Sequence, residues 1–142
     1  MPLGSRALIQ AVLAHLRADP KLGAIVHFGS VEGSQDTDQS MYPPYVVVYA
    51  DTGDSSRERM SSEQTTRVDV TFTVQAVGAD ADQALWWADV LNGRMLDFKP
   101  QVPGWKCQAL RHDGSDPIDR ITEFTPPVSY SSDDYVLTAR RS

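Results

Sequence analysis

The side chains that most often perform chemistry are present in this sequence, but their spacing assembles no recognisable site. The three histidines are His15, His27 and His112, and none has a second histidine or a cysteine two to four positions away. A zinc site needs nitrogen and sulfur ligands at such short spacings, so we predict none. The segment 113–116, Asp-Gly-Ser-Asp, has the composition of a calcium loop but lacks its alternating ligands and closing glutamate. We interpret it as a solvated turn and expect no bound metal.

Catalytic motifs are not apparent either. The sequence has no glycine-rich phosphate loop and no nucleophile elbow. Cys107 is the single cysteine, so it cannot form an intrachain disulfide, and no base lies near it in the sequence. With 19 acidic residues, neighbouring carboxylates such as Asp133 and Asp134 arise by chance and favour a solvated surface. We therefore predict that the protein is not an enzyme and uses no cofactor.

The charge balance argues against a nucleic-acid-binding surface. The chain has 142 residues, 41% of them apolar, and a formal net charge of −6. Its basic residues are scattered, with Arg57 and Arg59 in one polar segment and Arg140 and Arg141 near the end. These are too few for a face that must neutralise many phosphates. A negative wall could still line a passage for DNA, because it repels the duplex and prevents sticking.

The elements that must position any functional residues are organised around Thr66–Val77. Apolar and polar residues alternate strictly there, with Val68, Val70, Phe72, Val74 and Ala76 on one side and Arg67, Asp69, Thr71, Thr73 and Gln75 on the other. This period of two predicts a half-buried strand that ends at Gly78. At about 3.4 Å per residue the strand would reach roughly 40 Å, so we expect part of it to meet something outside its own chain.

Helical periodicity predicts two helices. The first runs over 5–17, with Ser5 as its cap and an apolar face of Leu8, Ile9, Val12, Leu13 and Leu16. The second runs over 81–96 after an Asp80 cap, and we expect Ala84, Leu85, Ala88, Leu91 and Met95 to lie on the sheet. Trp86 and Trp87 sit about 100° apart on that helix, so we expect one in the core and the other at an edge or interface. Core filling without any interface role is the preferred interpretation of the pair.

The remaining segments are assigned to strands and loops. Further strands are predicted at 25–28, 45–50, 105–110 and 134–140. The segment 45–50 is apolar on both faces, which suggests cover by helices on one side and by other protein on the opposite side. We predict polar loops at 29–40 and 51–63, a turn at 112–117 and an extended segment at 122–130. The loop 51–63 is the first candidate for a contact arm.

These elements predict an α+β fold, with a small, mainly antiparallel β-sheet and two helices packed on one face. We expect a single domain, 1–142, because the sequence shows no repeat and no second composition. No apolar run approaches the roughly 20 residues of a membrane span, so we also expect no membrane association.

Several pieces of the sequence, in this order, carry a resemblance to a known family. They are Leu8-Ile9 with Leu13, the stretch Tyr42–Tyr49, the passage from Val74–Gly78 into Gln83–Asp89, Pro103–Cys107, and the stretch Thr125–Leu137. The ordered set resembles the tail terminator proteins of long-tailed bacteriophages, also called tail completion or head-to-tail joining proteins, particularly the forms in phages of actinobacteria. The resemblance covers most of the chain.

The resemblance implies a structural protein of the virion. Such proteins form a ring, typically a homohexamer, on the head-proximal end of the tail tube. The ring ends tube polymerisation, offers a docking surface to the head and leaves a central hole through which DNA passes without specific binding. The implied partners are further copies of the chain, the major tail tube protein and a head-tail connector or neck protein. Assembly would take place in the host cytoplasm.

Two alternatives remain open at this point. The chain could be a head-side neck or connector protein of the same junction, or a small non-enzymatic binding module that uses the sheet face for a ligand. Residues of the long loop, of the polar strand face and of the second helix are our predicted interaction sites. They are Asp54, Arg57, Glu58, Arg59, Arg67, Asp69, Thr71 and Trp86.

Overall fold

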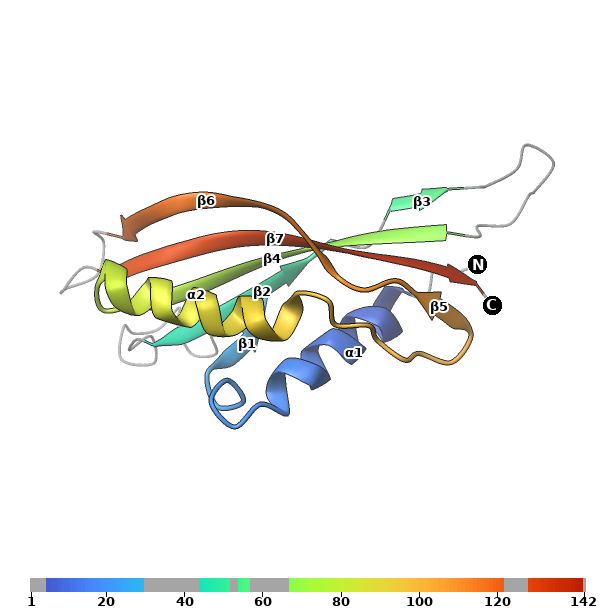
Figure 1. The fold of residues 1–142 in the computed structure, drawn as a ribbon, viewed down its shortest axis with the longest axis horizontal. Helices are drawn as coiled ribbons and strands as arrows, with labels where there is room; N and C mark the ends of the chain where they lie inside the picture. Colours follow the sequence, from blue (N-terminus) through green and yellow to red (C-terminus); the bar gives the residue numbers. More distant parts are fainter. Residues whose placement is uncertain (1–4, 30–43, 52–53, 57–66, 122–127, 142) are drawn as a thin grey trace.

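The fold is a computed structural model that describes residues 5–29, 44–51, 54–56, 67–121 and 128–141. Its elements follow one another along the chain (Figure 1) as α1 (Ser5–Arg17), β1 (Val26–Phe28), β2 (Tyr45–Ala50), β3 (Asp54–Ser56), β4 (Arg67–Gly78), α2 (Ala81–Met95), β5 (Trp105–Cys107), β6 (Arg111–Ile121) and β7 (Val128–Arg141). Neither helix is long and apolar enough to cross a membrane.

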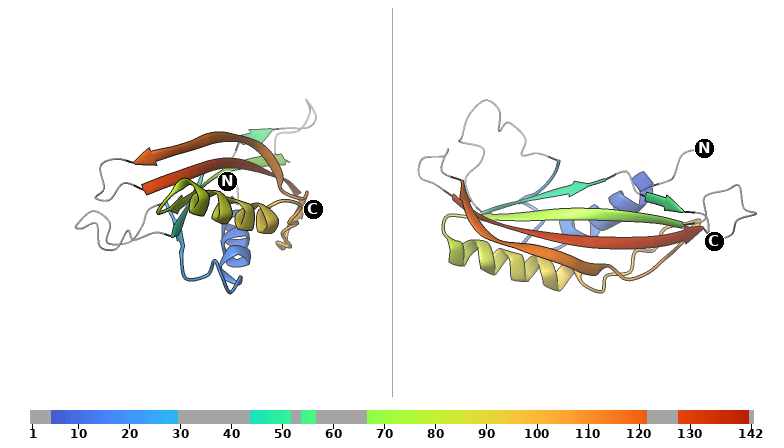
Figure 2. Two further views of the ribbon diagram at one scale, coloured as in Figure 1. Left: turned by 60° about the vertical axis from the view of Figure 1, so that its left-hand side comes forward. Right: turned by 90° about the horizontal axis from the view of Figure 1, so that it is seen from above.

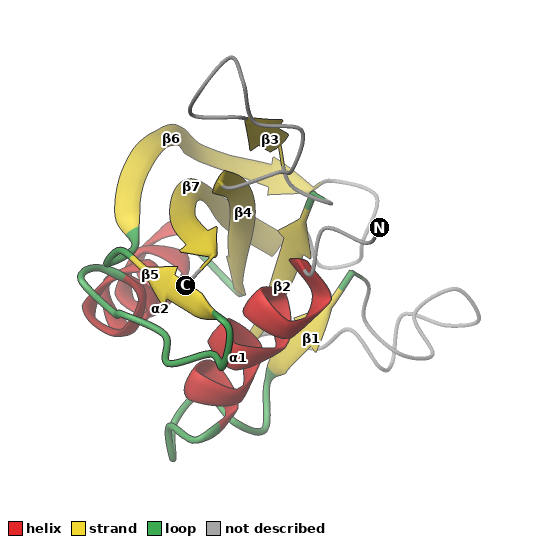
Figure 3. Ribbon diagram, turned by 90° about the vertical axis from the view of Figure 1, so that its right-hand side faces the viewer, coloured by secondary structure: helices red, strands yellow, loops and turns green. Residues whose placement is uncertain are grey.

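The strands of the described residues form one sheet, in the order β1-β2-β4-β7-β5. β3 pairs with β4 beyond the end of β2, and β6 pairs with β7 on the same side as β5. Only β1 and β2 run parallel, and every other pairing is antiparallel. Both helices lie on one face of the sheet (Figures 1 and 3). The predicted α+β class, with a mainly antiparallel sheet and two helices on one face, is confirmed.

The central strand pair has the length that the sequence predicts. Every residue of β4 pairs with a residue of β7, from Arg67 opposite Arg140 to Gly78 opposite Ser129, and the two strands run side by side along their length (Figure 2). The alternation in β4 is confirmed, because Val68, Val70, Phe72, Val74 and Ala76 are buried and the polar residues between them are half-buried. β7 is much longer than the predicted strand at 134–140, since it offers β4 a partner throughout.

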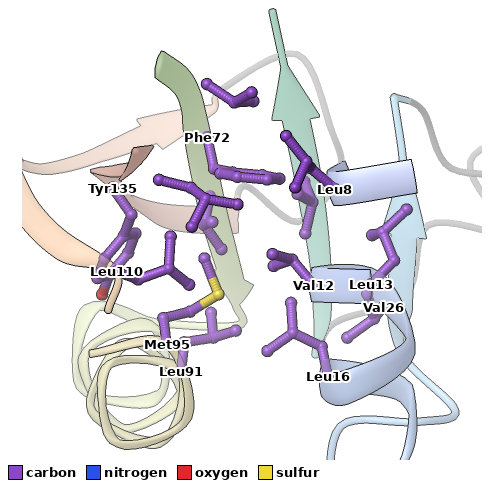
Figure 4. Packing of buried hydrophobic residues seen from close by; sticks show 14 of the residues in the cluster. Leu8, Val12, Leu13, Leu16, Val26, Phe72, Leu91, Met95, Leu110 and Tyr135 are labelled. Carbon is purple, nitrogen blue, oxygen red and sulfur yellow. The ribbon is translucent and has the colours of Figure 1, made fainter. Parts of the chain in front are cut away.

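The core lies between this sheet and the two helices. Side chains of α1 (Leu8, Val12, Leu16) and of α2 (Leu91, Met95) converge on Phe72 and Tyr135 from the sheet (Figure 4). The spacing of these residues in each helix gives one continuous apolar stripe, which is why both helices pack with that side inward. The apolar stripe predicted for α1 is therefore confirmed.

One residue of the predicted α2 stripe is misplaced. Leu85 is 51% exposed, whereas Ala84, Leu91 and Met95 are buried. Leu85 directly follows Ala84, so it is turned about 100° away from the line that contacts the sheet and faces β6 instead. The Asp80 cap is confirmed, because its side chain accepts a hydrogen bond from the backbone N–H of Gln83 at 2.8 Å.

A buried carboxylate joins the two helices. The Asp19 side chain is 3% exposed, accepts hydrogen bonds from the backbone N–H groups of Lys21 and Leu22, and pairs with the Arg94 guanidinium. Burial by itself would raise the pKa of Asp19, but these donors lower it below its usual value. Next to this pair, the His15 ring stacks on Phe98 at a centroid distance of 3.7 Å. The His15 ring is therefore held in place by packing.

The predicted turn at 112–117 is wrong. These residues belong to β6, which pairs with β7 from Arg111 opposite Val136 to Ile121 opposite Val128. The turn-forming residues are accommodated by irregularities in the ladder between His112 and Gly114 and between Asp116 and Asp119. Gly114 has φ +139, a conformation that residues with a side chain rarely adopt. A long neighbouring strand has overridden the local preference for a turn.

Two other boundaries differ from the predictions. The loop predicted at 51–63 contains β3, because residues 54–56 find partners on β4. The strand predicted at 105–110 ends at Cys107, after which the backbone N–H of Gln108 donates to the carbonyl of Thr138. Residues 30–40 of the loop predicted at 29–40, residues 52–53 and 57–63 of the loop predicted at 51–63, and residues 122–127 of the predicted extended segment lie outside the described residues.

β2 is buried on both faces from Tyr45 to Val48, as its composition predicts, whereas Tyr49 is 41% exposed. Val46 and Val48 belong to the main core, while Tyr45 and Val47 form a second cluster with Val77 and Val128 on the other face. The expectation that another protein covers this second face is wrong for Tyr45 and Val47, which are 5% and 4% exposed within the single chain.

Candidate functional site

The outer face of the sheet, opposite the helices, carries most of the predicted interaction residues that the structure describes. Antiparallel partners present their side chains on the same face. The register of β4 and β7 therefore brings together two rows, which are Arg67, Asp69, Thr71, Thr73 and Gln75 on β4 and Arg140, Thr138, Val136, Asp134 and Ser132 on β7. We call this set the outer face.

Hydrogen bonds connect the side chains of the outer face across the strands. The Thr138 hydroxyl donates to Asp69 Oδ1 at 2.6 Å, and Arg111 Nη1 on β6 donates to Thr138 Oγ1 at 3.2 Å. Arg67 Nη2 lies 3.2 Å from Asp69 Oδ2. Further along, the Thr73 hydroxyl donates to Asp134 Oδ1 at 2.7 Å. The network holds these polar groups in fixed positions, with the polar side chains of β4 half-buried and Thr138 buried.

Asp69 is the ionised centre of this network. Burial by itself would raise the pKa of Asp69, but the Thr138 hydroxyl, the Arg67 guanidinium and the positive charge of Arg111 lower it below its usual value. The carboxylate therefore stays charged at neutral pH, accepts the hydrogen bond of Thr138 and pairs with Arg67.

The predicted site residues fall into three groups. Arg67, Asp69 and Thr71 lie together on the outer face, and Asp54 of β3 is in register with Asp69.

Trp86 is on the other layer, on the side of α2 away from the sheet, where it is 48% exposed. Its ring meets Trp87 edge-on at 4.7 Å, and Trp87 packs against the core. One tryptophan is therefore turned toward the core, as predicted, although Trp87 is only partly buried, and a contact of Trp86 at an interface stays a prediction. Arg57, Glu58 and Arg59 lie outside the described residues.

A pocket of about 330 Å³ between α2 and β6 was not anticipated from the sequence. It is lined by Leu85, Ala88, Asp89, Asn92 and Leu96 of the α2 segment, by His112, Ser115, Asp116 and Ile118 of β6, and by Ser131 and Asp133 of β7. His112 Nε2 lies 3.1 Å from Asp133 Oδ1. The Ser131 hydroxyl is buried and has no hydrogen-bond partner among the described residues. We did not expect this pocket because residues 112–117, which supply part of its lining, were predicted to form a turn.

The other flank of the molecule carries a wider, apolar groove of about 920 Å³. It runs between α1 and the β1–β2 edge and is lined by Ser5, Arg6, Ile9, Gln10, Leu13, Ala14, Arg17, Ala18, Phe28, Ala50 and Asp51. Phe28, at the end of the edge strand β1, is 47% exposed. The groove and the acidic pocket share no lining residue. The elements that line them, α1 with β1 and α2 with β6, lie on different sides of the molecule (Figure 3).

These three surfaces differ in the groups that they expose. Within the described residues, no group of three or more histidine, cysteine, aspartate or glutamate side chains is placed to hold a metal ion. Cys107 is buried, and burial raises the pKa of its thiol although Lys99 lowers it slightly. What the surfaces offer instead is a fixed polar face, an acidic pocket and an apolar groove.

Comparison with known proteins identifies the fold. No protein-family model and no curated protein matches the chain. Among solved structures, the chain is similar to one from the virion of a native gene transfer agent particle, with 18% identity and a TM-score of 0.64 over 99% of this chain and 98% of that chain. A second solved structure, of a protein whose name states no function, matches with 12% identity and a TM-score of 0.58 over 97% of this chain and 94% of that chain. Our chain shares the complete fold of both proteins.

Proposed function

We propose that this protein is a tail terminator, one 1–142 domain whose copies form a ring on the head-proximal end of a phage tail tube. The observation that carries the proposal is the full-length match to a chain of a gene transfer agent virion, from the first helix to the last strand. It agrees with the ordered sequence pieces that resemble tail terminators. In this role the protein acts by assembly and catalyses no reaction.

The geometry of the sheet supports this role. A single copy leaves the outer face without helices, and that face carries a fixed network of polar groups suited to contact with the tail tube. The ring would be built from heterologous contacts, patch A of one copy against patch B of the next, and six copies close it if the rotation between neighbours is 60°. The net charge of −6 suits a lumen through which DNA slides.

The first experiment mixes the purified protein with tubes assembled from its major tail protein and images the tube ends by negative-stain electron microscopy. We expect a ring at one end and arrested tube growth. Tubes that keep growing with bare ends would reject the terminator role. Binding to the portal or adaptor instead would support a head-side neck protein, and a stable monomer with no tube or portal partner would favour the binding module.

The contact arm is tested by replacing Arg57, Glu58 and Arg59 together with alanine. We prefer this variant to a deletion of 55–62, because Ser55 and Ser56 are paired with β4 and their loss would disturb the sheet. We expect a folded protein, by circular dichroism, that no longer caps tubes. Normal capping by this variant would remove the arm from the proposed interface.

A further inference from the structure

The two flanks of the subunit have complementary shapes. On the α2–β6 flank, Leu85 and Leu96 are exposed by 51% and 39% and project beside the acidic pocket. On the α1–β1 flank, Ile9, Leu13 and Phe28 line an apolar groove. The α2–β6 flank therefore exposes two leucine side chains, and the α1–β1 flank presents an apolar groove in which such side chains would be buried.

The charges of the two flanks are complementary as well. The pocket contains Asp89 and Asp116, which form no ion pair with any residue that the structure describes. The groove is bordered by Arg6 and Arg17, which are exposed and likewise form no ion pair within the described part of the chain. Asp51 also lines the groove, and its carboxylate accepts a hydrogen bond from the backbone N–H of Thr71. Opposite charges on the two surfaces favour contact between them and disfavour contact of either surface with itself.

We propose that the α1–β1 flank of one copy, with Arg6 and Arg17, docks on the α2–β6 flank of the next copy, with Asp89 and Asp116. The two flanks lie at opposite edges of the sheet, beyond β1 and beyond β6. The contact is therefore heterologous, and each copy uses both flanks, as a closed ring requires. This inference rests on the proposed ring and names the surfaces that build it.

The test uses two charge-reversed proteins. One carries Arg6→Glu and Arg17→Glu, and the other carries Asp89→Lys and Asp116→Lys. Each variant alone presents the same charge on both flanks, so we expect at least a tenfold loss of tube capping and of self-association by sedimentation velocity. In an equal mixture every contact pairs opposite charges again, so we expect alternating rings and capping within about threefold of the unchanged protein. A control with Lys99→Glu and Lys106→Glu makes a similar charge change at exposed positions off both flanks.

Each outcome bears on one proposal. If the single variants cap tubes as the unchanged protein does, or if the mixture fails to recover while both variants remain folded, the flank assignment is overturned and the terminator role stands. If the unchanged protein does not cap tubes, the terminator role falls, and self-association decides the flanks. Recovery by the mixture would then support them, whereas an unchanged protein that stays monomeric at high concentration would overturn them too.

Discussion

Asp69 shows how a single residue can make the outer face sensitive to acid. Its pKa is lowered in the folded protein, so its contribution to stability is present above the pKa of an unfolded aspartate, near 3.9. That contribution is lost as the pH falls through the lower folded value, because protonation removes the charge that Arg67 and Arg111 favour. The outer face should therefore weaken below about pH 4, where the unfolded chain gains the proton more readily.

We predict that Asp69→Asn lowers the free energy of unfolding at pH 7 by about 1 kcal/mol, since an amide replaces a charged hydrogen-bond acceptor. The variant should also lose less stability than the unchanged protein between pH 6 and pH 3. Urea unfolding at several pH values measures both effects. Asp113→Asn, at an exposed position of β6, serves as the control. Equal acid sensitivity of the Asp69→Asn variant and the unchanged protein would contradict the assignment.

At the scale of elements, Gly78 decides how closely β4 approaches α2. A Cβ at this position would lie 2.5 Å from the backbone nitrogen of Ala84 and 2.9 Å from the backbone carbon of Gln83. Backbone atoms of a helix cannot move aside as a flexible side chain can. The glycine is therefore needed because strand and helix are in direct contact where β4 leads into α2.

We predict that Gly78→Ala destabilises the protein by about 2 kcal/mol or more, because the added methyl group forces β4 and α2 apart. Gly93→Ala is the matched control, since a Cβ at Gly93 in α2 would meet nothing within 4 Å. That variant should gain about 0.5–1 kcal/mol, because alanine is preferred over glycine inside a helix. Thermal and urea unfolding of both variants test the pair. Equal stability of the two would refute the close-contact explanation.

At the scale of the whole molecule, we expect the two adjacent tryptophans to contribute to different properties, Trp87 to folding and Trp86 to assembly. Trp87 packs against the core, whereas Trp86 is 48% exposed and has Lys21 Nζ 5.4 Å from its ring. Exposed tryptophans are enriched at protein interfaces and among the residues that dominate binding energy. The same substitution at the two positions should therefore affect different properties.

We predict that Trp87→Ala lowers the free energy of unfolding by about 2–3 kcal/mol, because its buried part leaves a cavity. Trp86→Ala should change stability by less than about 1 kcal/mol but reduce tube capping at least tenfold. Urea unfolding and electron microscopy of tube ends measure the two effects separately. Full capping by the Trp86→Ala variant would exclude this side chain from the interface.

Much of the fold follows from local patterns that the sequence carries without help from distant residues. The alternation over 67–76 predicts β4 and its two faces, and the three-and-four spacing of Leu8, Val12 and Leu16 predicts α1. The Asp80 cap predicts where α2 begins. Each of these signals is contained within a few consecutive residues, and burial of one face is enough to make it decisive.

The errors lie where a distant partner decides the local structure. Residues 112–117 have the composition of a turn, yet they form a strand because β7 supplies hydrogen-bond partners along β6. Leu85 matches a helical apolar stripe, yet it faces the pocket beside β6 rather than the sheet. Only the register of strands separated in sequence reveals these environments, because side-chain alternation does not identify the neighbouring strand.

The sequence by itself therefore determines the α+β class, the long central strand, the two helices and the absence of a recognisable catalytic motif. The tertiary structure decides which polar residues share the outer face and that Asp89, Asp116 and Ser131 line one pocket. It also decides that this pocket and the arginine-bordered groove lie on opposite flanks. The physical reason is that periodicity fixes which way a residue points within its own element, whereas pairing and packing between elements fix what it meets there.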